Sequence, residues 1–341
     1  MYLKHAKAFA CILIVIYHAL SFSSKFQLKN TFRADHFFGD MFFYGRVPFF
    51  FVVAGYLFHH SYSRNGKMKD TVVKRIKNLI PPYVFWNMIM MLMILISLQL
   101  GFSYGDKKYL STSEIISMSS GIGSIPANHS LWFVRDLMIL FLISPLLMRY
   151  QTFLPYISVL AFSFSIIHQN SNFLEASSLG FYIIGMYLYK SNQPKDLEAR
   201  IRGIRSSSIY VYLGAMFCLA FINQSHLMPK IIGIIGHFIG ISMITLIGEL
   251  LARGTGFISN ASLAISESSF LIYLSHIPIL SFFVKAVELN KPISELMHKH
   301  QFFNVITWLC FAAIIITVTT IIHRFIKQRF PQWLIVLTGS R

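Results

Sequence analysis

Long apolar stretches alternate with short polar segments along the whole chain. A stretch of about 18 or more apolar residues predicts a helix long enough to cross the hydrocarbon core of a bilayer. Hydropathy predicts about ten such spans, each bounded by polar or Gly/Pro-containing loops. They lie near residues 6–24, 41–60, 80–100, 131–148, 153–168, 177–190, 207–223, 230–251, 268–287 and 302–323. We therefore expect an all-α, polytopic membrane protein that forms a single domain over residues 1–341.

The composition supports a membrane protein and argues against a soluble one. Of 341 residues, 55% are hydrophobic and 13% are charged, whereas a soluble domain carries about a quarter charged residues. The net charge is +17, but most basic residues lie in short loops. This distribution indicates membrane topology and contact with anionic membrane lipid, and it argues against nucleic-acid binding. The 3 cysteines are scattered through apolar segments, so we expect neither a disulfide framework nor a metal site.

Lysine and arginine are distributed unevenly between the two sides of the predicted membrane. In loops and termini, the side that holds the N-terminus carries about twice as many as the opposite side, which is the cytoplasmic pattern. The number of spans then places both termini in the cytoplasm, with residues 324–341 as a short basic tail. The apolar run of the first span is too long for a typical signal-peptide core, so we expect a retained helix.

Two ionisable residues, Lys7 and His18, interrupt the first span. They stand 11 positions apart, which at about 100° per residue brings both side chains to one helix face, roughly 16 Å apart along the axis. A histidine at mid-membrane is costly, so it marks a candidate functional site, with a cation at the membrane surface below it. The alternative is a histidine that is hydrogen-bonded inside the helix bundle and has no chemical role.

Two further spans carry charged residues near their outer ends. Arg46 lies about five residues, or roughly 8 Å, below the outer face, where an arginine pairs, extends outward to water or faces a wet cavity. Arg135 and Asp136 are adjacent and point about 100° apart, so we expect each to pair with another helix and not with its neighbour. His18 and Arg46 are the natural partners for Asp136. The neighbouring Trp132 is typical of an interfacial anchor.

The ninth span contains Tyr273 and His276, which are three residues apart and therefore share a face. Pro278 loosens the helix and frees carbonyl groups, which favours a cavity lining over a lipid-facing surface. A purely structural Tyr/His pair is the alternative. By depth, His276 can meet His18 and the two buried arginines in one polar chamber.

A basic run precedes the third span and ends at Pro81-Pro82. Its members are Lys67, Lys69, Lys74, Arg75 and Lys77. The positive-inside signal explains part of this run. At the mouth of a polar chamber, the same cluster also has the charge to hold a phosphorylated ligand.

These motifs, in their order along the chain, resemble the family 3 membrane acyltransferases, which O-acetylate bacterial sugars and surface polysaccharides. Lys7 and His18 stand where that family has an arginine and a histidine in its first span. Residues 48–56 resemble its Pro-Phe-Phe-x-x-Ser-Gly signature, with Ala54 in place of the serine. Residues 75–83 resemble its Arg-x-x-Arg and Leu-Pro-Pro-Tyr-like stretch, with only the first arginine kept. Further matches are Trp132-Phe133-Val134-Arg135, Ile184-Gly185-Met186 and Tyr273-Leu274-Ser275-His276-Ile277-Pro278.

The resemblance implies a membrane acyltransferase in the bacterial inner membrane. Its donor is cytosolic acetyl-CoA, it needs no metal, and its acceptor is a hydroxyl of a saccharide, such as an O-antigen polysaccharide, or of a lipid-linked glycan. His18 is then the catalytic base, because a desolvated imidazole is neutral and takes a hydroxyl proton; a transient acyl carrier is the alternative role. Asp136 would orient the ring, while Arg135 or Arg46 steadies the developing oxyanion or grips the acceptor.

The resemblance also suggests where the two substrates bind. Acceptor contacts are expected at Trp132, Tyr273 and His276. The phosphates of coenzyme A are expected at Lys7, Lys74, Arg75 and Lys77. The separation of Lys7 from His18 is comparable to an extended pantetheine arm, so a donor held at these cations places its thioester beside the imidazole.

Two other functions fit the same pattern. A transporter or exporter of a saccharide or lipid-linked glycan would use the polar chamber as a permeation site, although the sequence lacks paired Gly/Pro-broken spans in two corresponding halves. A receptor-like membrane protein without chemistry is the third candidate. Transport by purified protein in vesicles without an acyl donor separates the transporter from the enzyme, and failure to bind acetyl-CoA favours the last two.

Overall fold

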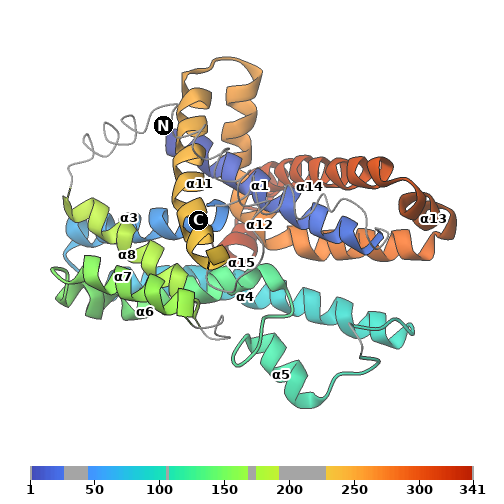
Figure 1. The fold of residues 1–341 in the computed structure, drawn as a ribbon, viewed down its shortest axis with the longest axis horizontal. Helices are drawn as coiled ribbons and strands as arrows, with labels where there is room; N and C mark the ends of the chain where they lie inside the picture. The colour runs from blue at the N-terminus through green and yellow to red at the C-terminus, as the bar shows by residue number, and fades with distance from the viewer. Residues whose placement is uncertain (1, 27–44, 105–106, 168–173, 192–227, 340–341) are drawn as a thin grey trace.

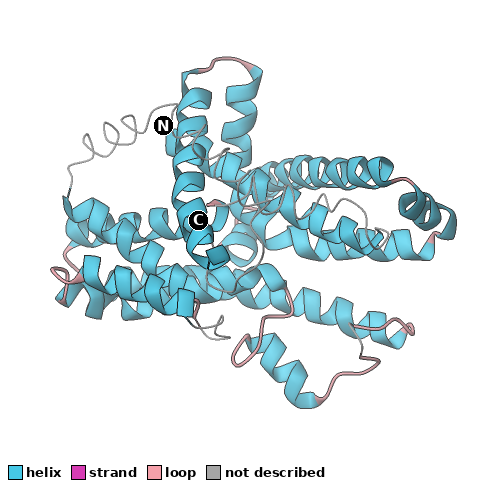
Figure 2. Cartoon of the chain, viewed as in Figure 1, coloured by secondary structure: helices cyan, strands magenta, loops and turns pink. Residues whose placement is uncertain are grey.

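The computed structural model describes residues 2–26, 45–104, 107–167, 174–191 and 228–339 (Figure 1). Nearly all of these residues are helical, and none lies in a strand apart from an isolated bridge between Tyr104 and Lys107 (Figure 2). Within the described ranges, 6 helices are long and apolar enough to cross a membrane: Tyr2–Phe26, Met68–Gln99, His129–Arg149, Gly233–Arg253, Phe257–Leu289 and Gln301–Arg329. An all-α, polytopic membrane protein is thus confirmed. The span expected at 207–223 lies outside the described residues.

The elements are labelled as in Figure 1. The longer helices are α1 (Tyr2–Ser23), α3 (Arg46–Asn65), α4 (Met68–Gln99), α6 (Trp132–Arg149), α11 (Met228–Arg253), α12 (Phe257–Leu289) and α14 (Gln301–Arg329). The shorter elements are η1 (Ser24–Phe26), α5 (Thr112–Ser120), η2 (His129–Leu131), α7 (Leu154–Ile167), α8 (Ala176–Ser191), α13 (Lys291–Lys299) and α15 (Trp333–Thr338).

The basic run before the third expected span belongs to the spanning helix itself. α4 starts at Met68 and passes through Pro81 and Pro82 without ending, whereas the prolines were expected near the start of the helix. A proline lacks the N–H that an α-helix uses, so the carbonyls of Lys77 and Asn78 lose their helical donors. The helix nevertheless continues on both sides of the two prolines. The basic side chains therefore stand on the same helix as the apolar residues that follow.

Two segments expected as loop or tail contain helices. In the expected external loop at 101–130, α5 begins with a capping box in which the side chains of Ser111 and Glu114 each accept a backbone N–H of the other residue. A hydrogen bond from Lys107, followed by those from Ser111, lowers the pKa of Glu114 to about 2. At the other end of the chain, α14 continues to Arg329 and α15 follows it, so much of the expected tail is helical.

α1 lies among α11, α12 and α14. Close approach is possible because the residues of α1 that face its neighbours are small. Ala6, Ala8 and Ala10 are fully buried, and a Cβ added to Gly248 of α11 would overlap Ala6. Small residues at helix interfaces are the usual means of packing helices within a membrane.

α1 and α12 run side by side in the same direction. His5 of α1 is hydrogen-bonded to Ser262 of α12. Further along, the thiol of Cys11 donates to the carbonyl of Ser269 at 3.4 Å. This register continues for two more turns and brings the C-terminal part of α1, at His18, against the proline-containing part of α12.

α3 and α8 touch through their backbones. A Cβ added to Gly55 of α3 would overlap the carbonyl of Tyr182, and a Cβ added to Gly185 of α8 would overlap the carbonyl of Val52. Only glycine fits at both positions, which are the glycines of two motifs noted in the sequence. This tight pair forms one wall of the fold.

Candidate active site

The centre of the candidate site is a pair of imidazole rings from α1 and α12. The ring centroids of His18 and His276 lie 5.1 Å apart, with an interplanar angle of 45°. His18 is half-buried. Among the described residues its ring contacts those of Tyr17 and His276 and makes no hydrogen bond. The ring nitrogens of His18 are therefore available to a substrate.

His276 presents a buried acceptor toward this pair. Its Nδ1 lies 2.6 Å from the carbonyl oxygen of Tyr273, and because a carbonyl can only accept, we assign the proton to Nδ1. Nε2 then carries the lone pair, and it is buried with no partner within the described part of the chain. A buried polar atom without a partner costs about 1–3 kcal/mol, so Nε2 marks a place where a polar ligand or water binds.

A cation stands next to the imidazole pair. The guanidinium carbon of Arg46 lies 3.7 Å from the centroid of the Tyr17 ring, a cation–π contact. The Tyr17 ring is in turn edge-on to His18, with centroids 5.1 Å apart. Gly45, at φ 89°, precedes α3 and donates its N–H to Nδ1 of His237 at 3.3 Å. The structure thus brings His18, His276 and Arg46 together, as their depths indicated.

Three residues that the sequence reasoning missed interact with His18 or Arg46, namely Tyr17, His129 and His237. His129 is exposed on η2 and interacts electrostatically with His18, whereas His237 of α11 interacts in the same way with Arg46. Tyr17 had no signal beyond its position next to a candidate, and His129 fell in an expected loop. His237 had a signal: it is a histidine inside an apolar span, and the cost argument applied to His18 applies to it too.

The expectation that Arg135 and Asp136 do not pair is wrong. Arg135 donates to Oδ1 of Asp136 from both Nη2, at 3.0 Å, and Nε, at 3.2 Å. The other carboxylate oxygen of Asp136 accepts the N–H of Glu175 at 3.1 Å, so its hydrogen bonds go to neither His18 nor Arg46. The side chain of arginine is long enough to curl back onto its neighbour, although the two Cβ atoms diverge.

The same pair ties three parts of the fold together. Arg135 also donates to the carbonyl of Gly121, at 3.1 Å, after α5. Asp136 is fully buried and holds the chain just before α8 through Glu175. This arrangement assigns the pair an architectural role within the described residues.

Removal of one member of this pair should be costly. We expect Arg135→Met to destabilise the protein by about 3–5 kcal/mol, because it leaves a buried carboxylate without its cation. The double variant Arg135→Met/Asp136→Leu should recover part of that loss, since no uncompensated charge remains. Thermal unfolding in detergent measures both. Lys285→Met is the control, because Lys285 pairs with Glu288 at the surface, where a pair is worth about 0–1 kcal/mol. Equal destabilisation of the single and double variants would contradict the prediction.

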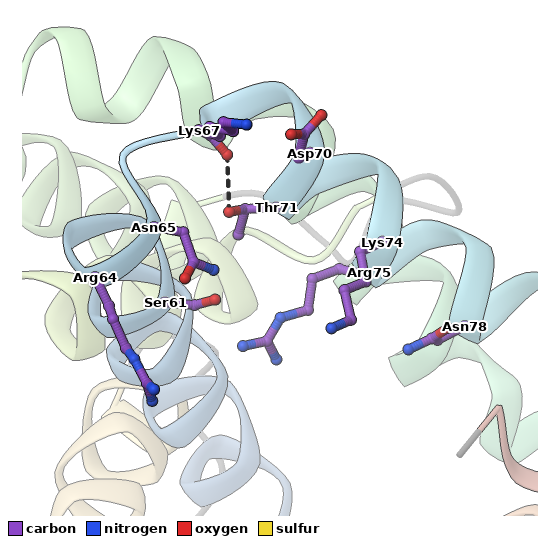
Figure 3. Close-up of a pocket in the computed structure, with 9 residues that line it drawn as sticks. All are labelled: Ser61, Arg64, Asn65, Lys67, Asp70, Thr71, Lys74, Arg75 and Asn78. Atoms are coloured by element: carbon purple, nitrogen blue, oxygen red, sulfur yellow. Dashed lines mark hydrogen bonds between the residues drawn. The ribbon is translucent and has the colours of Figure 1, made fainter. Parts of the chain in front are cut away.

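A cavity of about 680 Å³ lies between α3 and α4 (Figure 3). It is lined by Ser61, Arg64, Asn65, Lys67, Asp70, Thr71, Lys74, Arg75 and Asn78. Figure 3 shows the side chains of Lys74 and Arg75 extending from α4 into the space between the two helices. Arg75 donates to the carbonyl of Leu57 at 3.2 Å and lies over the ring of Phe141 at 5.7 Å. Basic side chains outnumber acidic ones in this lining, so the cavity favours an anionic ligand.

Of the four residues expected to hold the donor, two line the cavity and two do not. Lys74 and Arg75 line the cavity, whereas Lys77 and Lys7 do not belong to its described lining. Lys7 is half-buried on α1 and interacts electrostatically with Glu267 of α12. Lys7 and Arg75 therefore do not line one common phosphate-binding cavity in the described residues.

The aromatic residues expected to contact the acceptor have packing roles in the fold. The hydroxyl of Tyr273 donates to the carbonyl of Ser130, and the centroid of its ring lies 5.4 Å from that of the Phe133 ring. The ring of Trp132 lies 6.1 Å from that of Phe51. Tyr273 thus fixes the start of α6 against α12, next to His276.

Comparison with known proteins identifies the family to which the chain belongs. A family model described as an acyltransferase domain, that of the family 3 acyltransferases, matches residues 2–324. The chain belongs to this family of acyltransferases and is a multi-pass membrane protein. The resemblance noted in the sequence is thereby confirmed.

Among curated proteins, the chain is similar to the succinoglycan biosynthesis protein ExoH of Rhizobium meliloti (strain 1021). The two are 25% identical over 323 residues, which cover 89% of this chain and 81% of the relative. No solved structure matches the chain.

Proposed function

We propose that the protein is a membrane O-acyltransferase. It moves an acetyl group from cytosolic acetyl-CoA to a hydroxyl of a surface polysaccharide or of its lipid-linked precursor, at the bacterial inner membrane. The observation that carries this proposal is the His18–His276 ring pair, in which His18 makes no hydrogen bond to a described residue and Nε2 of His276 is a buried acceptor without a described partner. Imidazole groups held in this way suit proton transfer from a hydroxyl.

The donor site is proposed at the basic cavity between α3 and α4. Its volume of about 680 Å³ is within the usual range for ligand pockets, about 300–1,000 Å³. Arg64, Lys67, Lys74 and Arg75 supply the charge that three phosphate groups of coenzyme A require. The pantetheine arm would then run from this cavity inward toward His18.

The proposed reaction uses three polar side chains, those of His18, Arg46 and His276. The acceptor hydroxyl gives its proton to His18 as its oxygen bonds to the thioester carbonyl carbon. Arg46 stabilises the negative charge that develops on the carbonyl oxygen, and Nε2 of His276 accepts a hydrogen bond from the acceptor. Collapse of the intermediate breaks the C–S bond, and the proton on His18 passes to the departing thiolate. The products are the acetyl ester and free coenzyme A.

The acceptor class is supported by two observations. The similar protein ExoH is named for the biosynthesis of succinoglycan, a polysaccharide. In addition, His129 is exposed and interacts electrostatically with His18, so we propose that the acceptor approaches the imidazole pair from that side.

Mass analysis of surface glycans tests this proposal. Cells that carry the gene are expected to produce glycans with an acetyl increment that is absent when the gene is deleted, while the amount of glycan stays the same. Loss of the glycan itself, with no change in its acetylation, would instead support an exporter. Purified protein should also transfer label from acetyl-CoA to the glycan in detergent, where export is not possible.

A further inference from the structure

The last described helix lies against the helix that carries the basic cavity. α15 follows α14 and turns back onto α4 (Figure 1). The indole N–H of Trp86 donates to the carbonyl of Leu337 at 3.0 Å. Leu334 and Thr338 are buried, so α15 is packed in place and is not an exposed tail. The family match ends at residue 324, and α15 is therefore an addition to the matched region.

The contact is closest at Gly339, directly after α15. Its φ of 64° is in the left-handed region, where glycine is favoured, and a Cβ at this position would overlap the carbonyl oxygen of Asn78. In a regular helix that carbonyl accepts the N–H of the residue four positions on, which here is Pro82 and has none. The end of α15 thus meets α4 at the turn where the prolines have removed its internal hydrogen bonds.

The two contacts lie on opposite sides of the proline pair. Asn78 precedes Pro81-Pro82 and Trp86 follows it. Helices bend most readily at proline, so α4 has its weakest turn between these two contacts. Because α15 and Gly339 contact α4 on both sides of this turn, they limit its bending.

The side chains that depend on this turn are those of the cavity. Asn78 itself lines the cavity, and Lys74 and Arg75 stand one turn before it on the same helix. A change in the angle of α4 at the prolines would therefore move these side chains relative to α3, which supplies the opposite wall through Ser61 and Arg64.

We propose that α15 is a positioning element for the basic cavity: by bridging α4 across Pro81-Pro82, it holds Lys74, Arg75 and Asn78 in the arrangement that binds the phosphates of the acyl donor. This inference rests on the proposed function for the identity of that donor. Gly339 and Trp86 are positioning residues, since neither belongs to the lining of the cavity.

The test uses the full chain in detergent, with coenzyme A as the probe. Gly339→Ala should raise the Kd for coenzyme A about tenfold, equivalent to about 1.4 kcal/mol, and raise the KM for acetyl-CoA to a similar extent while kcat stays within about twofold. Gly123→Ala is the matched control: its φ of 74° is also left-handed, but no atom lies within 4 Å of the added Cβ. We expect no change in donor affinity for this control.

A second variant and a second measurement keep the outcomes distinct. Trp86→Phe keeps a ring but removes the N–H that Leu337 accepts, so it should shift the Kd in the same direction by a smaller factor. Hydrogen exchange in residues 70–86 of the ligand-free protein should be faster in both variants than in the wild type. Unchanged exchange contradicts the proposal that α15 restrains α4. Faster exchange with unchanged affinity for coenzyme A contradicts the proposal that this restraint positions the donor site. If the wild-type protein binds no coenzyme A, the proposed donor is wrong, and that result is separate from the exchange data.

Discussion

Replacement of His18 by alanine is expected to reduce acetyl transfer by about 10²–10⁴-fold, the usual contribution of general acid–base catalysis. In the proposed mechanism, His18 takes the proton of the acceptor hydroxyl and returns it to the thiolate, so both halves of the reaction lose their proton carrier. The ring makes no hydrogen bond to a described residue. Its loss should therefore remove ring contacts with Tyr17 and His276 and leave the fold intact. Turnover of labelled acetyl-CoA by purified protein measures the effect.

Two controls separate a catalytic role from a structural one. His60→Ala removes an exposed histidine at the far end of α3 and should leave kcat unchanged. His18→Gln keeps a polar side chain that cannot carry the proton, and it should be as inactive as the alanine variant while the amount of protein in the membrane matches the wild type. Normal glycan acetylation by either His18 variant would rule out the proposed base.

Arg75→Ala is expected to raise the KM for acetyl-CoA by about 10–100-fold, because a hydrogen bond to a charged group contributes about 1.5–3 kcal/mol. Arg75 extends into the cavity from α4, and its guanidinium is already oriented by the Leu57 carbonyl and the Phe141 ring. A pre-oriented cation binds phosphate with little loss of side-chain freedom. The value of kcat should change much less than KM, since the cavity is distinct from the imidazole pair.

The conservative variant and a neighbouring lysine provide the comparison for Arg75. Arg75→Lys keeps the charge but loses the bidentate fork, so its KM should fall between those of the wild type and the alanine variant. Lys69→Ala, on the same helix but exposed and outside the cavity lining, should leave KM unchanged. Raised ionic strength should weaken donor binding by the wild type more than by Arg75→Ala. An unchanged KM for Arg75→Ala would place the donor elsewhere.

The cost of a polar side chain at membrane depth located both members of the imidazole pair, and the sequence allowed them to meet without specifying their contact. His18 and His276 were each located by the cost of a histidine within an apolar span, and the structure places their rings in contact. The same reasoning applied to Arg46 also succeeded. These predictions depend on the geometry of single helices, which the sequence specifies well.

Side-chain length and helix packing were harder to infer. The angle between Arg135 and Asp136 describes their Cβ directions, but the pairing is decided by the flexible end of the arginine. Lys7 and Arg75 were grouped by their charge and by the family resemblance, whereas the arrangement of α1 and α4 places only Arg75 at the cavity. Similarly, Pro81 and Pro82 were predicted to lie near the start of a helix. The contacts with α15 on either side of these prolines come from residues far along the chain, which local sequence does not reveal.

The backbone contact between α3 and α8 has a consequence for motion. Because Gly55 and Gly185 leave no gap between the two helices, neither can slide or rotate on the other without a collision of main-chain atoms. The two helices must therefore keep a fixed arrangement and move only as one rigid unit. Any change in the width of the basic cavity therefore falls to α4, whose turn at the two prolines lacks internal hydrogen bonds and is contacted on both sides by α15 and Gly339.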